Sequence, residues 1–287
     1  MVQAKQQKRG RILLATDKKV EERSLRYAVE FARALDSPMD YWIIVETVEE
    51  TRSIQPLLKK ETTLLQEIAP EVAAEVKRGL AAELMSDIHE GDYDLVILSF
   101  RGRRGLKKVF PRAEVLSILH HAKVNVLILW GRRQELKKLL FCTGGSPYGQ
   151  QAVEFGASVS AALETPVTLL YVAETEPALF LRRVSEKPEP EPETKRALDK
   201  ALETLKKAGV RVELKVRHGK VADQILSEAS SERYDLIVIG SHGMGGIRHF
   251  ILGSVSEELV KRARIPILVV RAREKRRGWR RIFRRGR

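Results

Sequence analysis

The sequence contains two copies of one pattern, and this internal repeat constrains the fold more than any other feature. Residues 93–99, with the sequence YDLVILS, recur at 234–240 as YDLIVIG, 141 positions later. Residues 122–129 (AKVNVLIL) recur at the same offset as 263–270 (ARIPILVV). A chain that repeats in this way is predicted to fold as two homologous domains in tandem.

Each half alternates short β-branched runs with segments of helical periodicity. The expected strands of the first half are residues 12–16, 40–45, 72–76, 94–98 and 124–130. The expected helices between them are residues 21–35, 52–68, 80–89 and 114–121. This alternation predicts an α/β fold in which each domain has a five-stranded parallel sheet with helices on both faces. We place the domains at residues 1–134 and 135–272, followed by a basic tail at 273–287.

The net charge of +14 is concentrated at the end of the chain. Of the residues 271–287, ten are Arg or Lys and one is Glu. Trp279, Ile282 and Phe283 interrupt this segment and would share one face of a helix, a pattern that suits an anionic membrane or an acidic protein. Nucleic acid is a third candidate partner, and a disordered basic tail without a partner is the simplest interpretation.

Cysteine content and hydropathy exclude several classes of protein. Cys142 is the single cysteine, so no internal disulfide can form, and its place in an apolar run predicts a small core residue. No apolar run reaches transmembrane length, and the basic start lacks the apolar core of a signal peptide. We therefore expect a cytoplasmic protein, with peripheral membrane contact through the tail as an open alternative.

A glycine-rich segment follows the strand-like run 234–239 and precedes a helical pattern at 255–262. It reads Gly240-Ser241-His242-Gly243, then Gly253-Ser254 after nine further residues. Glycines let backbone N–H groups approach an anion, and a helix N-terminus carries partial positive charge. The order of strand, glycine loop and helix therefore predicts a phosphate-binding loop, although neither the Walker A nor the Rossmann pattern is present.

This segment resembles the nucleotide loop of the universal stress protein family, because its three glycines and final serine stand at that family's spacing. The resemblance implies an adenine nucleotide alpha hydrolase-like fold and a pseudo-dimer in which the last strands of the two halves pair within one chain. It also implies ATP or another adenine nucleotide as ligand, with Mg²⁺ as a companion ion. The binding residues that it implies are Gly240, Ser241, His242, Gly243, Gly253, Ser254, Val255, Val172, Thr143 and Gly144.

The first half matches only one side of the family's site. Thr16-Asp17 and Val45 match the adenosine side, but Arg112 and Ala113 occupy the positions of the second half's final Gly-Ser pair. An arginine side chain would stand where backbone approaches phosphate. We therefore interpret the first domain as a scaffold that does not bind ATP in the family's manner. The basic loop before Arg112 leaves another anion open, although a solvated charged loop is the simpler interpretation.

The second half keeps the loop but ends its first strand in Thr143-Gly144, where the family has Thr-Asp. Loss of a buried carboxylate contact costs about 1–3 kcal/mol, which would weaken ATP binding without abolishing it. Val172 keeps the base-side position. His242 and His249 are expected to flank the phosphates, and no paired carboxylates or metal-ligand cluster accompanies them in the sequence. No catalytic residue is therefore assigned, and any ATP hydrolysis is expected to be slow.

These features favour a stress-response regulator or adaptor that binds an adenine nucleotide in its second domain. One alternative is a nucleotide-independent adaptor that docks on a membrane transporter through the basic tail. The other is a weak ATPase or an adenylating enzyme. A further homodimer of the whole chain stays open. The acidic repeat at 188–193 (PEPEPE) is expected to be an extended, exposed spacer.

Overall fold

The computed structural model describes residues 10–17, 22–68, 71–79, 85–99, 112–130, 136–174, 190–243 and 252–271. The first half contains β1 (Arg11–Thr16), α1 (Glu22–Ala34), β2 (Met39–Val45), α2 (Val48–Ile68), β3 (Ala73–Arg78), α3 (Met85–Glu90), β4 (Tyr93–Ser99), α4 (Arg112–His121) and β5 (Asn125–Ile128). The second half contains β6 (Leu139–Cys142), α5 (Pro147–Ala162), β7 (Val167–Ala173), α7 (Pro192–Lys207), β8 (Val212–His218), α8 (Val221–Ser231), β9 (Leu236–Gly240), α9 (Ser254–Arg262) and β10 (Ile267–Val270). The strand–helix alternation predicted from the sequence is confirmed.

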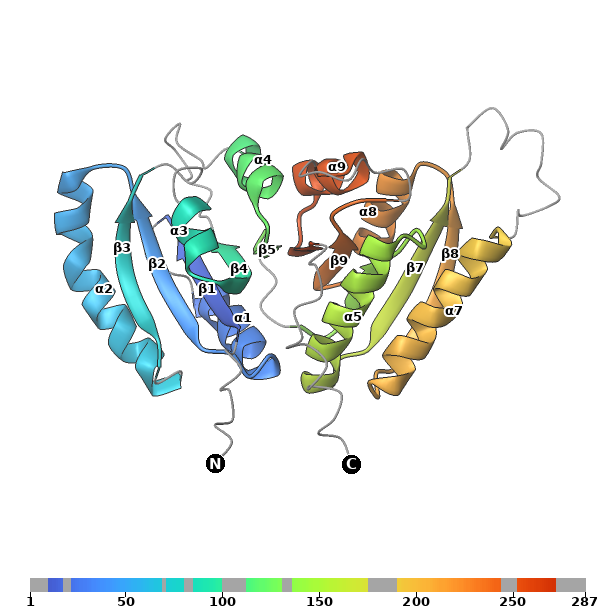
Figure 1. Ribbon diagram of the computed structural model, residues 1–287, viewed down its shortest axis with the longest axis horizontal. Helices are drawn as coiled ribbons and strands as arrows, with labels where there is room; N and C mark the ends of the chain where they lie inside the picture. Colours follow the sequence, from blue (N-terminus) through green and yellow to red (C-terminus); the bar gives the residue numbers. More distant parts are fainter. Residues whose placement is uncertain are drawn as a thin grey trace, which may run out of the picture.

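The described strands form one continuous ten-stranded sheet in the order β3-β2-β1-β4-β5-β10-β9-β6-β7-β8. Neighbouring strands within each half are parallel, whereas β5 and β10 are antiparallel at the centre of the sheet. Figure 1 shows the two halves on either side of this central pair. The predicted α/β fold and the pairing of the two last strands within one chain are therefore confirmed.

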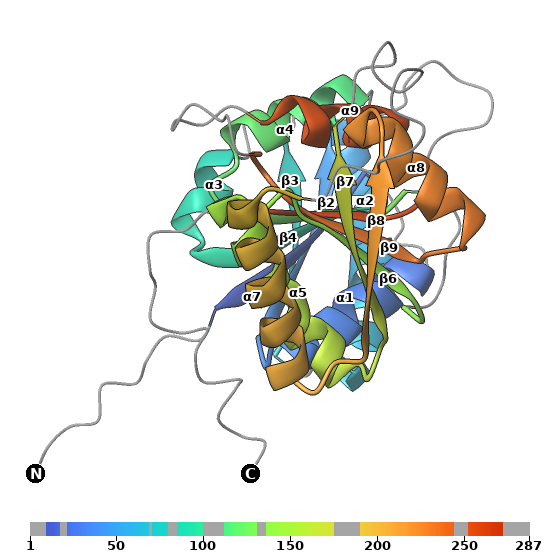
Figure 2. The same cartoon turned by 90° about the vertical axis from the view of Figure 1, so that its right-hand side faces the viewer.

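Helices cover both faces of the sheet and define two hydrophobic cores. One core packs side chains of α1, α2 and α5, including Phe31, Leu65 and Phe155, against one face. The other packs side chains of α4 and α9, including Leu119 and Leu259, against the opposite face. In Figures 1 and 2, α4 and α9 lie side by side over the centre of that second face, at the top of both views. No helix among the described residues is both long enough and apolar enough to span a bilayer.

The paired residues of the two strands that join the halves are apolar. The residues paired there, all with no exposed surface, are Val126, Leu127, Ile128, Ile267, Leu268 and Val269. Burial of one aliphatic side chain stabilises a fold by roughly 1.5–3 kcal/mol. Separation of the halves would expose all of these side chains to water. The two halves therefore form one packed unit, and the arrangement of one half constrains the other.

Helix α2 begins earlier than the expected residue 52. Its start is fixed by a capping box, in which the Glu50 N–H donates to Thr47 Oγ1 (3.1 Å) while the Glu50 carboxylate accepts from the Thr47 N–H (3.3 Å). The Thr-x-x-Glu spacing was available in the sequence, but the apolar periodicity that set the expected start appears only later. Local capping therefore overrides periodicity at this boundary.

The acidic repeat is only partly the extended spacer that was expected. Its last two residues, Pro192 and Glu193, form the first turn of α7. Proline is compatible with the first helical position because its missing N–H has no partner there in any case. A glutamate in the first turn is stabilised by the helix dipole. The same residue types that exclude a packed core thus also favour a helix start. Residues 175–189 lie outside the described part of the chain.

Candidate functional site

The carboxyl ends of β6 and β9 lie next to each other at the point where the chain leaves the sheet in two directions. These strands are parallel neighbours, paired from Leu139 with Leu236 to Cys142 with Ile239. After β6 the chain enters α5 on one face, and after β9 it enters α9 on the other. Ligands of open α/β sheets bind at such a switch point. The topology therefore places any ligand site of the second half between these two strand ends.

Gly240, at the end of β9, is required by packing against α5. A Cβ atom at this position would stand 2.7 Å from both the carbonyl carbon and oxygen of Tyr148, which is backbone that cannot move aside cheaply. The Gly240 carbonyl in turn accepts a hydrogen bond from Ser256 Oγ (2.9 Å) in α9. Gly240 was expected as a ligand-binding glycine. The structure shows in addition that it lets the two helix starts come close to one strand end.

Gly253 is the glycine at which the returning chain crosses the end of β9. Its N–H donates to the Ser241 carbonyl (2.8 Å), and the Ser241 N–H donates to the Val270 carbonyl (2.9 Å). An added Cβ would lie 3.2 Å from the Ser241 oxygen and 3.3 Å from His242 Cα. A side chain at residue 253 would therefore press directly on the backbone of residues 241–242.

The N-terminus of α9 carries backbone donors without a side-chain cap. Gly253 is its N-cap residue and offers no side chain, and the first helical hydrogen bond runs from the Glu257 N–H to the Gly253 carbonyl (2.9 Å). The N–H groups of Ser254, Val255 and Ser256 precede that bond, so they are the ones that a helix leaves for an external acceptor. The helix dipole adds partial positive charge at the same place. This geometry suits an anion.

His242 ties the loop to the start of α5. Its carbonyl accepts a hydrogen bond from Ser146 Oγ (3.2 Å), and that hydroxyl also caps α5 by accepting from the Gly149 N–H (3.1 Å). The His242 ring lies 4.9 Å from the ring of Tyr148, and its Nδ1 is 3.0 Å from Ser241 Oγ. Ser146 and Tyr148 were not among the predicted site residues. The Ser-Pro pair at 146–147, a strong helix-start pattern, was the feature of the sequence that could have identified them.

The loop after β9 and the start of α9 form one wall of the switch point, and the turn after β6 forms the other. Thr143 Oγ1 accepts from the Gly145 N–H (3.2 Å), and Gly145 has a φ of +87°, a conformation that favours glycine. Gly144, between them, is exposed, and a Cβ added there would meet no atom within 4 Å. Val172 is buried at the end of β7, next along the same edge. The predicted residues of both walls therefore lie at one edge of the sheet, with a direct link through Ser146.

The first domain contacts the second at the start of α9. His120, in the last turn of α4, accepts a hydrogen bond at Nδ1 from the Leu252 N–H (3.5 Å). Its Nε2 lies 4.0 Å from the Glu257 carboxylate in the first turn of α9. Figure 2 shows α4 and α9 together over this part of the sheet. The first half thus touches the segment that presents the backbone donors.

Several predictions for the first half fall outside the described residues. Thr16 and Val45 are described, and both are buried at the ends of β1 and β2. The basic loop 100–111 is not described, and neither are the side chains of Arg112 and Ala113 at the start of α4. His249 is likewise outside the described part. The loss of phosphate binding in this half therefore stays a prediction.

Cys142 is a core residue, as predicted. It is buried in the second core, and burial raises the pKa of its thiol well above the usual range. A thiol that stays protonated at neutral pH is a poor nucleophile. Although Cys142 directly precedes the turn of the candidate site, it therefore contributes packing.

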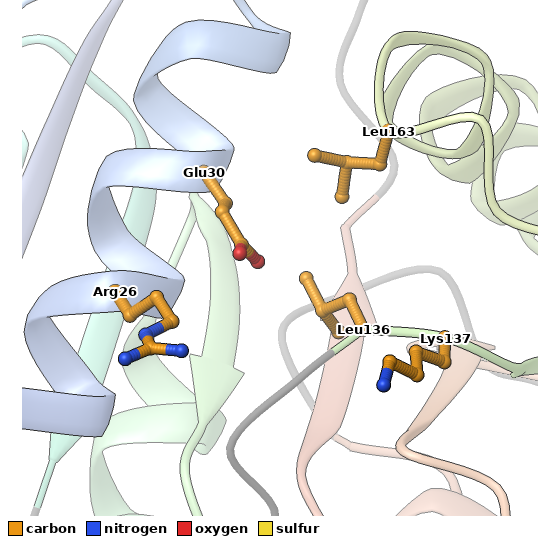
Figure 3. A pocket seen from close by; sticks show the side chains of 5 residues that line it. All are labelled: Arg26, Glu30, Leu136, Lys137 and Leu163. Atoms are coloured by element: carbon orange, nitrogen blue, oxygen red, sulfur yellow. The ribbon is translucent and has the colours of Figure 1, made fainter.

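A separate hollow of about 270 Å³ lies between α1 of the first half and the segments that precede β6 and follow α5 in the second half (Figure 3). It is lined by Arg26, Glu30, Leu136, Lys137 and Leu163. Leu136 and Lys137 precede β6, so this hollow is at the amino edge of the second half's strands. The candidate site is at their carboxyl edge. The two features are therefore distinct.

Fold and site together define a tandem, doubly wound α/β protein whose second half has a glycine-containing loop and an uncapped helix N-terminus at its switch point. Comparison with known proteins gives the family. The family model for the universal stress protein family matches twice, over residues 8–129 and 135–271. The chain belongs to the universal stress protein family, in a form with two family domains in one chain.

The chain is similar to several curated members of the family. It is 26% identical to universal stress protein Slr1230 of Synechocystis over 75% of this chain and 70% of that protein. It is 29% identical to universal stress protein MJ0531 of Methanocaldococcus jannaschii over 59% of this chain and 99% of that protein. Among solved structures, a universal stress protein from Archaeoglobus fulgidus is 20% identical with a TM-score of 0.58, covering 91% of this chain and 98% of that chain. At that identity the structural likeness supports the fold alone.

Proposed function

We propose that the second domain binds an adenine nucleotide and that the protein acts as a nucleotide-responsive regulator or adaptor. The observation that carries this proposal is the N-terminus of α9, which has no side-chain cap. Its N-cap residue, Gly253, lies against the end of β9 and donates a hydrogen bond to the Ser241 carbonyl. Backbone donors, a helix dipole and a glycine that keeps side chains away are what a phosphate group needs. Membership of a family with a nucleotide-binding branch supports adenine nucleotides in particular.

In this proposal the ligand acts by binding to elements that belong to both halves. A bound phosphate would contact α9, which the first domain touches through His120, while a nucleoside at the β6 turn would contact the wall formed by α5 and α7. Thr194 and Ala197 of α7 pack on the Gly145 turn of that wall. We assign no protein ligands to Mg²⁺, which in nucleotide sites keeps several waters and binds largely through phosphates. The ligand would thus link elements that belong to both halves.

Isothermal titration calorimetry of ATP, ADP and AMP tests this proposal with the wild type and a Gly253→Arg variant. The substitution copies Arg112 of the first half into the second. It places a side chain against the Ser241 and His242 backbone. We expect about one site per wild-type chain, and an affinity at least about 100-fold lower in the variant because more than one hydrogen bond to a charged group is lost.

Ser230→Arg is the matched control. Ser230 is exposed in the last turn of α8, at the opposite edge of the sheet, and the new residue adds the same charge. This control is expected to bind as the wild type does. If the wild type binds none of the three nucleotides, the nucleotide proposal is wrong, and an adaptor that works through the basic tail becomes the leading function.

A further inference from the structure

Arg271 is a buried cation at the end of β10. Only 6% of its surface is exposed, although in the sequence it belongs to the start of the strongly basic C-terminal stretch. Its backbone N–H donates to Asn125 Oδ1 (3.0 Å) in the first half, which fixes its position at the junction. Arg271 is therefore part of the folded domain rather than of the tail.

The guanidinium group of Arg271 has no counter-charge among the described residues. Its Nε and Nη2 atoms are enclosed and have no hydrogen-bond partner there. Burial alone lowers the pKa of this group to about 10, and no carboxylate acts against that shift. An arginine remains charged even so, and a buried charge without a partner is strongly destabilising. Such a group is expected where an anionic ligand completes the site.

Arg271 is adjacent to the loop that presents the backbone donors of α9. The carbonyl of Val270, the residue before it, accepts the Ser241 N–H (2.9 Å), and the Ser241 carbonyl accepts the Gly253 N–H (2.8 Å). Ile267 and Val269 of β10 belong to the core on the α9 face. Arg271 directly follows β10, so continued alternation of side chains directs it to the same face. The residue before it is thus linked through Ser241 to Gly253, the N-cap residue of α9.

The internal repeat supplies a comparison for this position. At the offset of 141, Arg271 corresponds to Trp130, whose side chain packs against the core on the same face. The framework thus accepts an uncharged aromatic side chain at this point of the fold. The buried cation occurs in the half that has the glycine loop, and the half that lacks the final Gly-Ser pair has none at the equivalent position. The buried positive charge therefore occurs together with the glycine loop and is not required by the framework that the two halves share.

We propose that Arg271 binds the phosphate chain of the nucleotide and gives the site its preference for phosphorylated ligands over the nucleoside. This inference rests on the proposed nucleotide function and names the residue that determines specificity within it. The backbone donors of α9 would hold one phosphate group, and the guanidinium would neutralise charge that those neutral donors cannot. A fork of N–H donors also suits phosphate oxygens better than a single ammonium group does.

Calorimetry with ATP and with adenosine on the full-length protein tests the inference. In Arg271→Met and Arg271→Trp we expect ATP affinity to fall by about 10–100-fold, because a hydrogen-bonded charge pair is lost, while adenosine affinity stays within about twofold. The Trp variant copies the side chain found at Trp130. Arg262→Met is the matched control, since it removes one positive charge from the exposed surface of α9. It is expected to leave both affinities unchanged.

Thermal unfolding without ligand separates this role from a structural one. Removal of an uncompensated buried charge should leave the Arg271 variants at least as stable as the wild type. A lower unfolding temperature would show that the charge stabilises the fold, and would overturn the inference. The inference would also be overturned if the variants bound ATP as tightly as the wild type, or if their affinities for ATP and for adenosine fell by the same factor. Failure of the wild type to bind any nucleotide would instead refute the proposed function, and this inference with it.

Discussion

The two halves share one framework but hold it together with different side chains. Tyr93 and Tyr234 are equivalent residues, the first at the start of β4 and the second two residues before β9. The Tyr93 hydroxyl donates to Asp40 (2.6 Å) in β2, whereas the Tyr234 hydroxyl donates to Glu228 (3.1 Å) in α8. Each tyrosine is thus anchored by a carboxylate, but from a different element. The fold therefore constrains the position of a buried hydroxyl more strongly than the identity of its partner.

The carboxyl ends of the same strands differ in their contacts as well as in sequence. Ser99 ends β4 and places its hydroxyl 2.6 Å from that of Ser24 in α1. Gly240 ends β9 and lets the backbone of α5 come within van der Waals distance. The first half uses this point for a polar contact between strand and helix. The second half uses it to bring two helix N-termini close to one strand end.

The largest expected effect tests the carboxylate anchor of the second half. Glu228 is buried and accepts hydrogen bonds from Lys215 (3.0 Å), Arg217 (2.7 Å) and Tyr234. Burial opposes its ionisation, but these partners prevail and lower the pKa of its carboxyl. We expect Glu228→Gln to reduce the free energy of unfolding by about 3 kcal/mol at pH 7. This value is at the low end of the range for loss of a buried ion pair, because both cations are partly exposed.

The pH dependence of this effect has a definite sign. A carboxylate with a lowered folded-state pKa stabilises the fold above its unfolded pKa, about 4.3, and loses that contribution as pH falls through the lower folded value. Urea unfolding of the wild type and Glu228→Gln between pH 7 and pH 3 measures it. The difference in free energy of unfolding between the two proteins should become smaller below about pH 4. A difference that stays constant down to pH 3 would contradict the ionic anchor.

The next effect concerns the strand ends. Gly240→Ser copies Ser99 into the second half and forces a Cβ against the Tyr148 backbone. Overpacking of this kind typically costs about 1–3 kcal/mol. Chemical denaturation should show that loss, whereas Gly144→Ser, where an added Cβ meets nothing within 4 Å, should be neutral. Equal stability of Gly240→Ser and the wild type would show that α5 can shift, and that the contrast between the halves is not one of packing.

A gain of affinity for ATP is expected when the second half receives the aspartate that the first half has directly after its first strand. Gly144→Asp gives the second half the Thr-Asp pair that the first half has at 16–17, and Gly144 is exposed with space for a side chain. One restored hydrogen bond to a nucleoside hydroxyl should tighten ATP binding about tenfold. Calorimetry of Gly144→Asp against Gly144→Asn separates the carboxylate from its shape. Unchanged or weaker binding would show that the nucleoside does not approach this turn.

The smallest expected effect tests the contact between the halves. His120→Ala removes the acceptor of the Leu252 N–H at the return of the loop. Because the hydrogen bond is long and the side chain is partly exposed, we expect the binding free energy of ATP to weaken by only about 0.5–1 kcal/mol. This corresponds to a two- to fivefold lower affinity for ATP. His121→Ala is the control, since His121 is exposed and bonds only within its own helix among the described contacts. Identical binding by both variants would make the first domain a passive partner.

The sequence predicted the architecture because its information is local and repeated. Each strand is a short apolar run, and the offset of 141 residues matches β4 with β9 and β5 with β10. The place of the candidate loop followed from the same pattern. What a strand contacts is not encoded in its own residues. The reason for Gly240, a close approach of the Tyr148 backbone, therefore became visible only in three dimensions.

Residues that act through distant contacts were missed for the same reason. Ser146 joins α5 to His242 across 96 positions in the sequence, and His120 reaches Leu252 across 132. Arg271 was counted with the basic tail because composition does not distinguish a buried arginine from a solvated one. The predicted domain boundary at residue 272 includes Arg271 in the second domain, but its burial was not predicted.

The central claim is that one chain holds one adenine nucleotide, in its second half. Native mass spectrometry of the full-length protein titrated with ATP counts bound molecules directly. The account predicts a single ATP per chain, which is lost in Gly253→Arg. Two molecules per wild-type chain would show that the first half binds as well, and none would show that the glycine loop serves another ligand or only the fold.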